Sequence, residues 1–281
     1  MGCVQSAASA TDAHGRSSSK PSSSSREHSW RTTGIVALRD QNLRELPKKL
    51  FSQESDLPER VRNVDATNNR LTTIPREISL WCGITRLVLA SNEIESLPET
   101  IGTLTRLKTL TLDGNRLREF PSSIGDLRAL VTLSACDCEL ETLPTSVSRC
   151  AALTTVRIAR NKGLRSSALD ALAECERLEE IDASACALTV LPAALGRLKR
   201  LRALNVDDNL GVHTIPSEVF KSCESLSKLS AHGTSVRNVE YIDGYDVYVA
   251  RAKERHGRII SGNSMIVNER RGLDYGFDHR A

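Results

Sequence analysis

A short apolar pattern returns along most of this 281-residue chain at an almost constant interval. Its clearest copy is the segment 107–121, LKTLTLDGNRLREFP. The first apolar position recurs at Val61, Ile84, Leu107, Leu130, Leu153, Leu178, Leu201 and Leu226, with steps of 23, 23, 23, 23, 25, 23 and 25 residues. Periods of this length indicate stacked supersecondary units rather than one closed globular core. An irregular first copy at 35–47 is expected to serve as the N-terminal cap, because an end unit has no neighbour to cover it.

Each copy predicts a short strand followed by a turn. The pair Leu110 and Leu112 points into the core, and the residue between them points out. Nine such strands, stacked in parallel about 4.8 Å apart, would give a concave sheet on the order of 40 Å long. After each strand an inward asparagine can satisfy backbone groups of neighbouring loops. This column is Asn69, Asn92, Asn115, Asn161 and Asn209. The expected fold is therefore an α/β, right-handed solenoid with a parallel concave sheet and a cap at each end.

The spacing also places most of the eight cysteines. Cys138 and Cys186 stand at the asparagine position. Cys150, Cys175 and Cys223 fall where other copies carry a core leucine, so they are predicted to pack as small hydrophobes. The N-terminus lacks an apolar secretory region, which predicts reduced thiols. The Cys136-x-Cys138 pair lacks the further ligands that a metal site needs. Copy five, 153–176, lacks the usual Leu-Pro pair, and its segment SSALDALAEC has helical spacing.

The ends of the chain are expected to differ from the repeats. Residues 1–32 are rich in serine and predict a disordered tether. The opening MGCVQS fits acylation, with myristate on Gly2 and palmitate on Cys3, although so short a motif also occurs by chance. Residues 33–256 form the predicted repeat domain, which closes with a helix near 245–256. A tyrosine cluster in this helix predicts a cap or, alternatively, a binding site. Residues 257–281 are predicted to be a flexible tail.

No catalytic motif is present in the sequence, and a net charge of +3 gives no strong attraction for nucleic acid. No cofactor or metal is expected. The candidate partner-binding residues project from the concave strands: Arg86, Thr111, Ser134, Arg157, Asp182, Asn205, Asp207, Ser230 and His232. Arginine is a frequent interface anchor, which favours Arg86 and Arg157. His232 has no partner at a readable spacing and is expected to be a surface histidine. The plain alternative is a solvated sheet face.

The 23-residue pattern LxxLxLxxNxLxxLPxxIGxL resembles the intracellular, Ras-group class of leucine-rich repeat proteins. The N-terminal Met-Gly and the sequence Gly244-Tyr245-Asp246-x-Tyr248 resemble, more narrowly, the leucine-rich repeat-containing protein 57 family. The resemblance implies a small, membrane-tethered or cytosolic binding protein without known catalysis. We expect a monomeric, non-catalytic protein-binding adaptor or scaffold that is cytoplasmic and peripheral on the cytoplasmic face of a membrane. The alternative is a regulatory subunit in a small-GTPase or phosphatase signalling complex.

Overall fold

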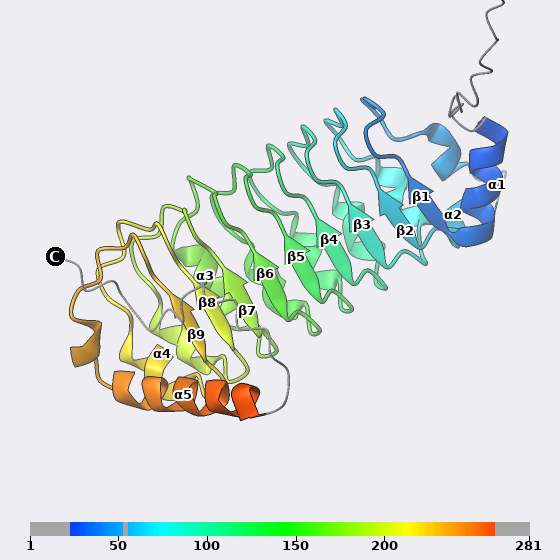
Figure 1. The fold of residues 1–281 in the computed structure, drawn as a ribbon. Helices are drawn as coiled ribbons and strands as arrows, with labels where there is room; N and C mark the ends of the chain where they lie inside the picture. Colours follow the sequence, from blue (N-terminus) through cyan, green and yellow to red (C-terminus); the bar gives the residue numbers. More distant parts are fainter. Residues whose placement is uncertain (1–22, 53–55, 262–281) are drawn as a thin grey trace, which may run out of the picture.

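Nine three-residue strands stack side by side into one open parallel sheet in the computed structural model, which describes residues 23–52 and 56–261 (Figure 1). Their spatial order follows the chain: β1 (Ile35–Ala37), β2 (Asn63–Asp65), β3 (Arg86–Val88), β4 (Thr109–Thr111), β5 (Thr132–Ser134), β6 (Thr155–Arg157), β7 (Glu180–Asp182), β8 (Ala203–Asn205) and β9 (Lys228–Ser230). The predicted solenoid with a parallel sheet is confirmed.

Equivalent residues of successive copies lie opposite one another in this sheet. Leu110 of β4 pairs with Leu87 on one side and Leu133 on the other. The central residue of each strand is buried, whereas its two neighbours are exposed or half-buried, except Val88, Ser134 and Ser230, which are also buried. Because successive side chains of a strand point to opposite faces, the leucines build the core and the intervening residues line the sheet surface.

Short helices cover the other side of the strands (Figure 1). Most are 3-10 helices that begin directly after the proline of each copy, because the fixed φ of proline ends the extended segment. The 3-10 helices are η1 (Lys48–Phe51), η2 (Arg76–Leu80), η3 (Glu99–Thr103), η4 (Ser122–Asp126), η5 (Thr145–Arg149), η6 (Ala193–Arg197) and η7 (Val239–Tyr241). The α-helices among them are α2 (Leu57–Arg60), α3 (Ser167–Leu172) and α4 (Ser217–Ser222). Helix α3 is the helix expected in copy five.

The N-terminal end differs from the expected tether. Residues Ser23–Thr33 form helix α1, which lies against β1 and α2 at the blue end of Figure 1. Trp30 is only 7% exposed and joins the hydrophobic core, so its burial holds a serine-rich segment in place. The first copy is the end unit of the sheet, where β1 pairs in register with β2. Helix α1 adds to this cap by packing against β1 and α2. The remaining predicted tether, with Gly2 and Cys3, lies outside the described residues.

The C-terminal cap is helix α5 (Tyr245–Ser261), which runs beside α4 and β9 (Figure 1). Tyr248 and Ala252 are buried, and the Tyr248 hydroxyl accepts a hydrogen bond from the Leu229 amide of β9 at 3.1 Å. The Arg251 guanidinium donates to the carbonyl oxygens of Phe220 and Cys223 near the end of α4. These contacts favour the cap over a tyrosine binding site. The helix passes the expected boundary at 256, and residues 262–281 lie outside the described part.

Candidate partner-binding surface

Seven of the nine predicted concave residues lie on strands β3 to β9, and Asp207 and His232 lie two residues after β8 and β9. The nine differ in how free their side chains are. Arg86 is exposed and has no ion-pair partner among the described residues. Arg157 lies 3.7 Å from the Glu180 carboxylate of the next strand, with both side chains more than half exposed. An exposed pair of this kind contributes little to stability, so both charges remain available to a partner.

Other predicted residues bind within the sheet surface. The Ser134 hydroxyl, in a residue 6% exposed, donates to Asp113 at 2.7 Å. Asp182 accepts hydrogen bonds from the amide and the hydroxyl of Ser184. The Asn205 side-chain oxygen accepts from the Asp207 amide at 3.1 Å. These hydrogen bonds fix the side chains on the surface. Thr111 lies half-buried in β4, near the middle of the same surface.

A Ser-His-Asp cluster at the C-terminal end of the surface was missed in the sequence. The Ser230 hydroxyl lies 2.8 Å from both oxygens of Asp207, and the backbone amide of His232 donates to the same carboxylate at 2.7 Å. The ring Nδ1 of His232 lies 3.1 Å from Ser230 Oγ and 3.4 Å from Asp207 Oδ1. The offset of 23 to 25 residues between strands was the signal that could have revealed this cluster.

This cluster does not have the geometry of a nucleophilic triad. In a triad, one ring nitrogen takes the serine proton while the other binds the carboxylate. Here the same Nδ1 lies against both groups, and the serine hydroxyl is already directed at the carboxylate. Asp207 therefore ties β8 to β9 and sets the orientation of His232.

The column of asparagines (Asn69, Asn92, Asn115, Asn161 and Asn209), here called the asparagine ladder, hydrogen-bonds the loops of successive copies to one another. The amide of Asn161, which is fully buried, donates to the carbonyls of Ala135 and Ile158 and accepts from the Leu140 amide at 3.0 Å. Each ladder asparagine thus satisfies buried groups of two successive copies. Cys138 and Cys186 occupy this position as predicted, and their thiols point at the same class of carbonyl, 3.4 Å from Leu112 O and 3.3 Å from Ile158 O.

The ladder predicts a stabilising substitution. A thiol is a weak donor and a weak acceptor, whereas an asparagine amide supplies two donors and a strong acceptor. We expect Cys138→Asn to raise the free energy of unfolding by about 1 kcal/mol through the added hydrogen bonds. Urea unfolding under reducing conditions measures the change, and Cys138→Ser, which lacks the reach of the amide, is the control. A lower urea midpoint for Cys138→Asn would mean that the larger side chain does not fit.

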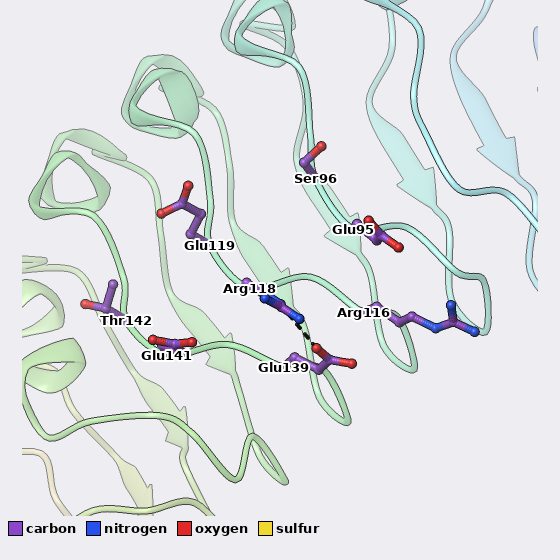
Figure 2. A pocket seen from close by; sticks show the side chains of 8 residues that line it. All are labelled: Glu95, Ser96, Arg116, Arg118, Glu119, Glu139, Glu141 and Thr142. Atoms are coloured by element: carbon purple, nitrogen blue, oxygen red, sulfur yellow. Dashed lines mark hydrogen bonds and ion pairs between the residues drawn. The ribbon is translucent and has the colours of Figure 1, made fainter.

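A charged groove lies beside the sheet, on the loops that follow the strands of copies two to four (Figure 2). Its volume is about 750 Å³, and its lining residues are Glu95, Ser96, Arg116, Arg118, Glu119, Glu139, Glu141 and Thr142. Arg116 pairs with Glu93 at 2.9 Å, and Arg118 pairs with Glu139 at 3.4 Å. The carboxylates of Glu95 and Glu119 have no hydrogen-bond or ion-pair partner among the described residues.

This groove was also missed in the sequence, although its signal was present. Charges of opposite sign alternate at a spacing of 23 residues in two columns, Glu93-Arg116-Glu139 and Glu95-Arg118-Glu141. Stacking brings residues of successive copies side by side. Arg116 pairs with Glu93 of its own column, and Arg118 pairs with Glu139 of the other column. A mixed-charge surface of this kind suits a polar protein partner. Across residues 23–52 and 56–261, no group of three or more metal-ligating side chains is gathered that could hold an ion.

Comparisons with known proteins give the family. A family model described as a leucine-rich repeat region matches residues 99–242, just over half of the chain. The chain belongs to the leucine-rich repeat family. It is also 39% identical over 90 residues to the plant intracellular Ras-group-related LRR protein 7 of Oryza sativa subsp. japonica, a match that covers 32% of this chain and 29% of that protein. The matched part therefore spans less than a third of that relative.

Solved structures share the fold at low sequence identity. The TLR13 chain of a TLR13-ssRNA13 complex aligns with a TM-score of 0.62 and 20% identity over 72% of this chain and 28% of its own. Internalin C2 from Listeria monocytogenes str. 4b F2365 aligns with a TM-score of 0.54 and 20% identity over 66% of this chain and 79% of its own. PEPR1, solved with AtPEP1, aligns with a TM-score of 0.53 and 23% identity over 71% of this chain and 31% of its own. These likenesses show the leucine-rich repeat fold alone.

Proposed function

We propose that this leucine-rich repeat protein is a non-catalytic protein-binding adaptor that acts as a monomer at the cytoplasmic face of a membrane. The observation that carries the proposal is the nine-stranded surface itself. It presents outward side chains from consecutive copies without bringing a nucleophile, base and charge stabiliser into reacting geometry. Leucine-rich repeat proteins generally act in protein binding, and two structural neighbours were solved with bound molecules, TLR13 with ssRNA13 and PEPR1 with AtPEP1.

A charge-reversal variant tests use of the concave face. Arg157→Glu with Asp182→Lys should lose most of the partner recovered by affinity purification from cells, because both side chains stand at the middle of the proposed contact surface. The matched control, Arg106→Glu with Glu176→Lys, changes the same charges at exposed positions outside the strands. Circular dichroism checks that both variants fold. Equal recovery of the partner by the two double variants would contradict concave binding.

The membrane part of the proposal rests on Gly2 and Cys3 in the motif MGCVQS. One acyl chain gives weak, reversible binding and two give stable anchoring. Changing Gly2→Ala removes the myristate acceptor, so we expect the protein to move from the membrane to the soluble fraction of lysed cells. Cys3→Ser should weaken retention without abolishing it. Persistence of Gly2→Ala in the membrane fraction would remove the acyl-anchor proposal. Among the described residues, no helix has the length and apolar content needed to cross a bilayer.

A second candidate function is regulation of a small-GTPase or phosphatase complex. It is favoured by the 39% identity to a protein described as Ras-group-related. Affinity purification in the presence of a non-hydrolysable GTP analogue, compared with GDP, distinguishes this regulatory role from that of a general adaptor. A partner recovered only in the GTP-analogue sample supports the regulatory role, and nucleotide-independent recovery supports the general adaptor.

A further inference from the structure

Charge is unevenly distributed along the axis of the solenoid. Residues 23–52 contain six lysines and arginines against three acidic residues, whereas residues 81–192 contain 12 against 15. The N-terminal end therefore carries a local excess of +3, and the middle of the solenoid carries −3. The net charge of the whole chain is +3, and this single value does not reveal that the two segments differ in sign.

The basic residues of the N-terminal end come from several elements that meet there. Arg31 lies in α1, Arg44 in the loop after β1, and Lys48 in η1, and all three side chains are exposed. None of the three has an ion-pair partner among the described residues. Lys49, by contrast, pairs with Glu27 of α1. Because helix α1 contacts both β1 and α2, these positions belong to one end of the molecule (Figure 1).

The proposed acyl anchor reaches the fold at this same end. Twenty residues lie between Gly2 and Ser23, where α1 begins, and they connect the lipid to the solenoid. A chain of that length spans at most about 70 Å in any conformation. The end that carries α1 is thus the part of the solenoid nearest to the point where the anchor joins the fold. The tether raises the local concentration of this end at the lipid surface. A contact too weak to hold the protein by itself can then still orient it.

We propose that the N-terminal end, through Arg31, Arg44 and Lys48, rests on an anionic phospholipid surface, so that the solenoid stands end-on from the membrane. The proposal rests on the acyl anchor put forward above. Each lysine or arginine near an anionic surface contributes about 1 kcal/mol.

The acidic middle favours this orientation over one in which the solenoid lies flat. The strands of the middle segment, β3 to β7, stand about 10 to 30 Å from β1 along the axis, at about 4.8 Å per strand. The Debye length at physiological ionic strength is about 8 Å, so in the end-on orientation salt screens most of the repulsion between these carboxylates and the lipid. A flat orientation would press the acidic middle against lipid of the same sign. End-on, the concave face and the groove remain open to a partner.

Vesicle sedimentation of the full, myristoylated chain tests the proposal. The readout is the ratio of its partition coefficient on phosphatidylcholine vesicles with 30% phosphatidylserine to that on phosphatidylcholine alone. The variant Arg31→Gln/Arg44→Gln/Lys48→Gln should lower this ratio by about 100-fold, about fivefold for each side chain. The matched control is Arg200→Gln/Lys228→Gln/Arg237→Gln, which removes three exposed cations at the other end and should leave the ratio nearly unchanged.

The outcomes separate the two proposals. If both triple variants lower the ratio equally, the solenoid lies flat and the end-on orientation is wrong. If neither does, the lipid contact is wrong. Loss of the acyl anchor has a different signature. It abolishes binding to phosphatidylcholine alone, whereas the Gly2→Ala chain keeps its preference for phosphatidylserine because the N-terminal cations are intact.

Discussion

Raising the pH from 9 to 11 is expected to destabilise this protein by several kcal/mol under reducing conditions. Burial raises the pKa of Cys138, Cys150, Cys186 and Cys223 from 9.0 to about 11, and that of Cys175 to about 12. In the unfolded chain these thiols lose their protons near pH 9, while in the folded chain they keep them. The unfolded state then binds fewer protons, so the free energy of unfolding falls as the pH rises.

The size of this effect follows from the number of buried thiols. Between the unfolded and the folded pKa, each thiol lowers the free energy of unfolding by up to about 1.4 kcal/mol per pH unit. Below pH 9 the contribution of the thiols is fully present and constant. Urea unfolding at pH 8, 9, 10 and 11 with a phosphine reductant measures the slope.

Cysteine variants isolate the thiols from the lysines and tyrosines that titrate in the same range. The variant Cys150→Ala/Cys175→Ala/Cys223→Ala should show a flatter dependence on pH above 9, although its stability at pH 8 is lower. Cys82→Ala removes an exposed thiol and should leave the slope unchanged. If the triple variant keeps the full slope, other groups cause the alkaline destabilisation.

Replacing Trp81 by alanine is the single substitution expected to destabilise the fold most. Its side chain is fully buried at the end of η2 and stacks on Phe51, with ring centroids 5.0 Å apart and an interplanar angle of 13°. Its indole N–H donates to the Leu50 carbonyl at 3.0 Å. A buried tryptophan cut to alanine costs about 3–5 kcal/mol.

The loss should be concentrated at the N-terminal end, because a repeat contacts only its neighbours. Hydrogen exchange should therefore accelerate first in β1 and β2 of Trp81→Ala, while β6 to β9 keep their protection. Trp81→Phe retains an aromatic ring against Phe51 but loses the hydrogen bond, and about 1–2 kcal/mol of destabilisation is expected for it. Uniform acceleration across all nine strands would show that the solenoid unfolds as one cooperative unit instead.

The repeat spacing predicted most of the core because one rule applies to every copy. It placed the leucine pairs, the asparagine ladder and the cysteines at 138, 150, 175, 186 and 223 in the core or at its edge, where the structure has them. Trp81 falls three residues before Ile84, in the slot that holds Cys150 and Cys175 in later copies, so the same rule extends to it.

What the spacing could not predict are contacts that depend on a single copy or on the ends. Helix α1 exists because Trp30 finds a place in the core, which a count of serines does not reveal. The cluster of Asp207, Ser230 and His232 and the groove around Arg118 arise from side chains of different copies. Their positions follow from the register, but their pairing depends on side-chain conformations that only the structure supplies.

The sheet keeps its register although the copies differ in length. Val36 pairs with Val64 after 28 residues, Leu87 with Leu110 after 23, and Val156 with Ile181 after 25. None of the additional residues lies in a strand: they follow it, in loops such as 162–163 and in segments on the opposite side such as α3. Insertions there can accumulate during evolution without shifting the register of the sheet or its outward residues. The two sides of the molecule can therefore change in sequence and length independently of each other.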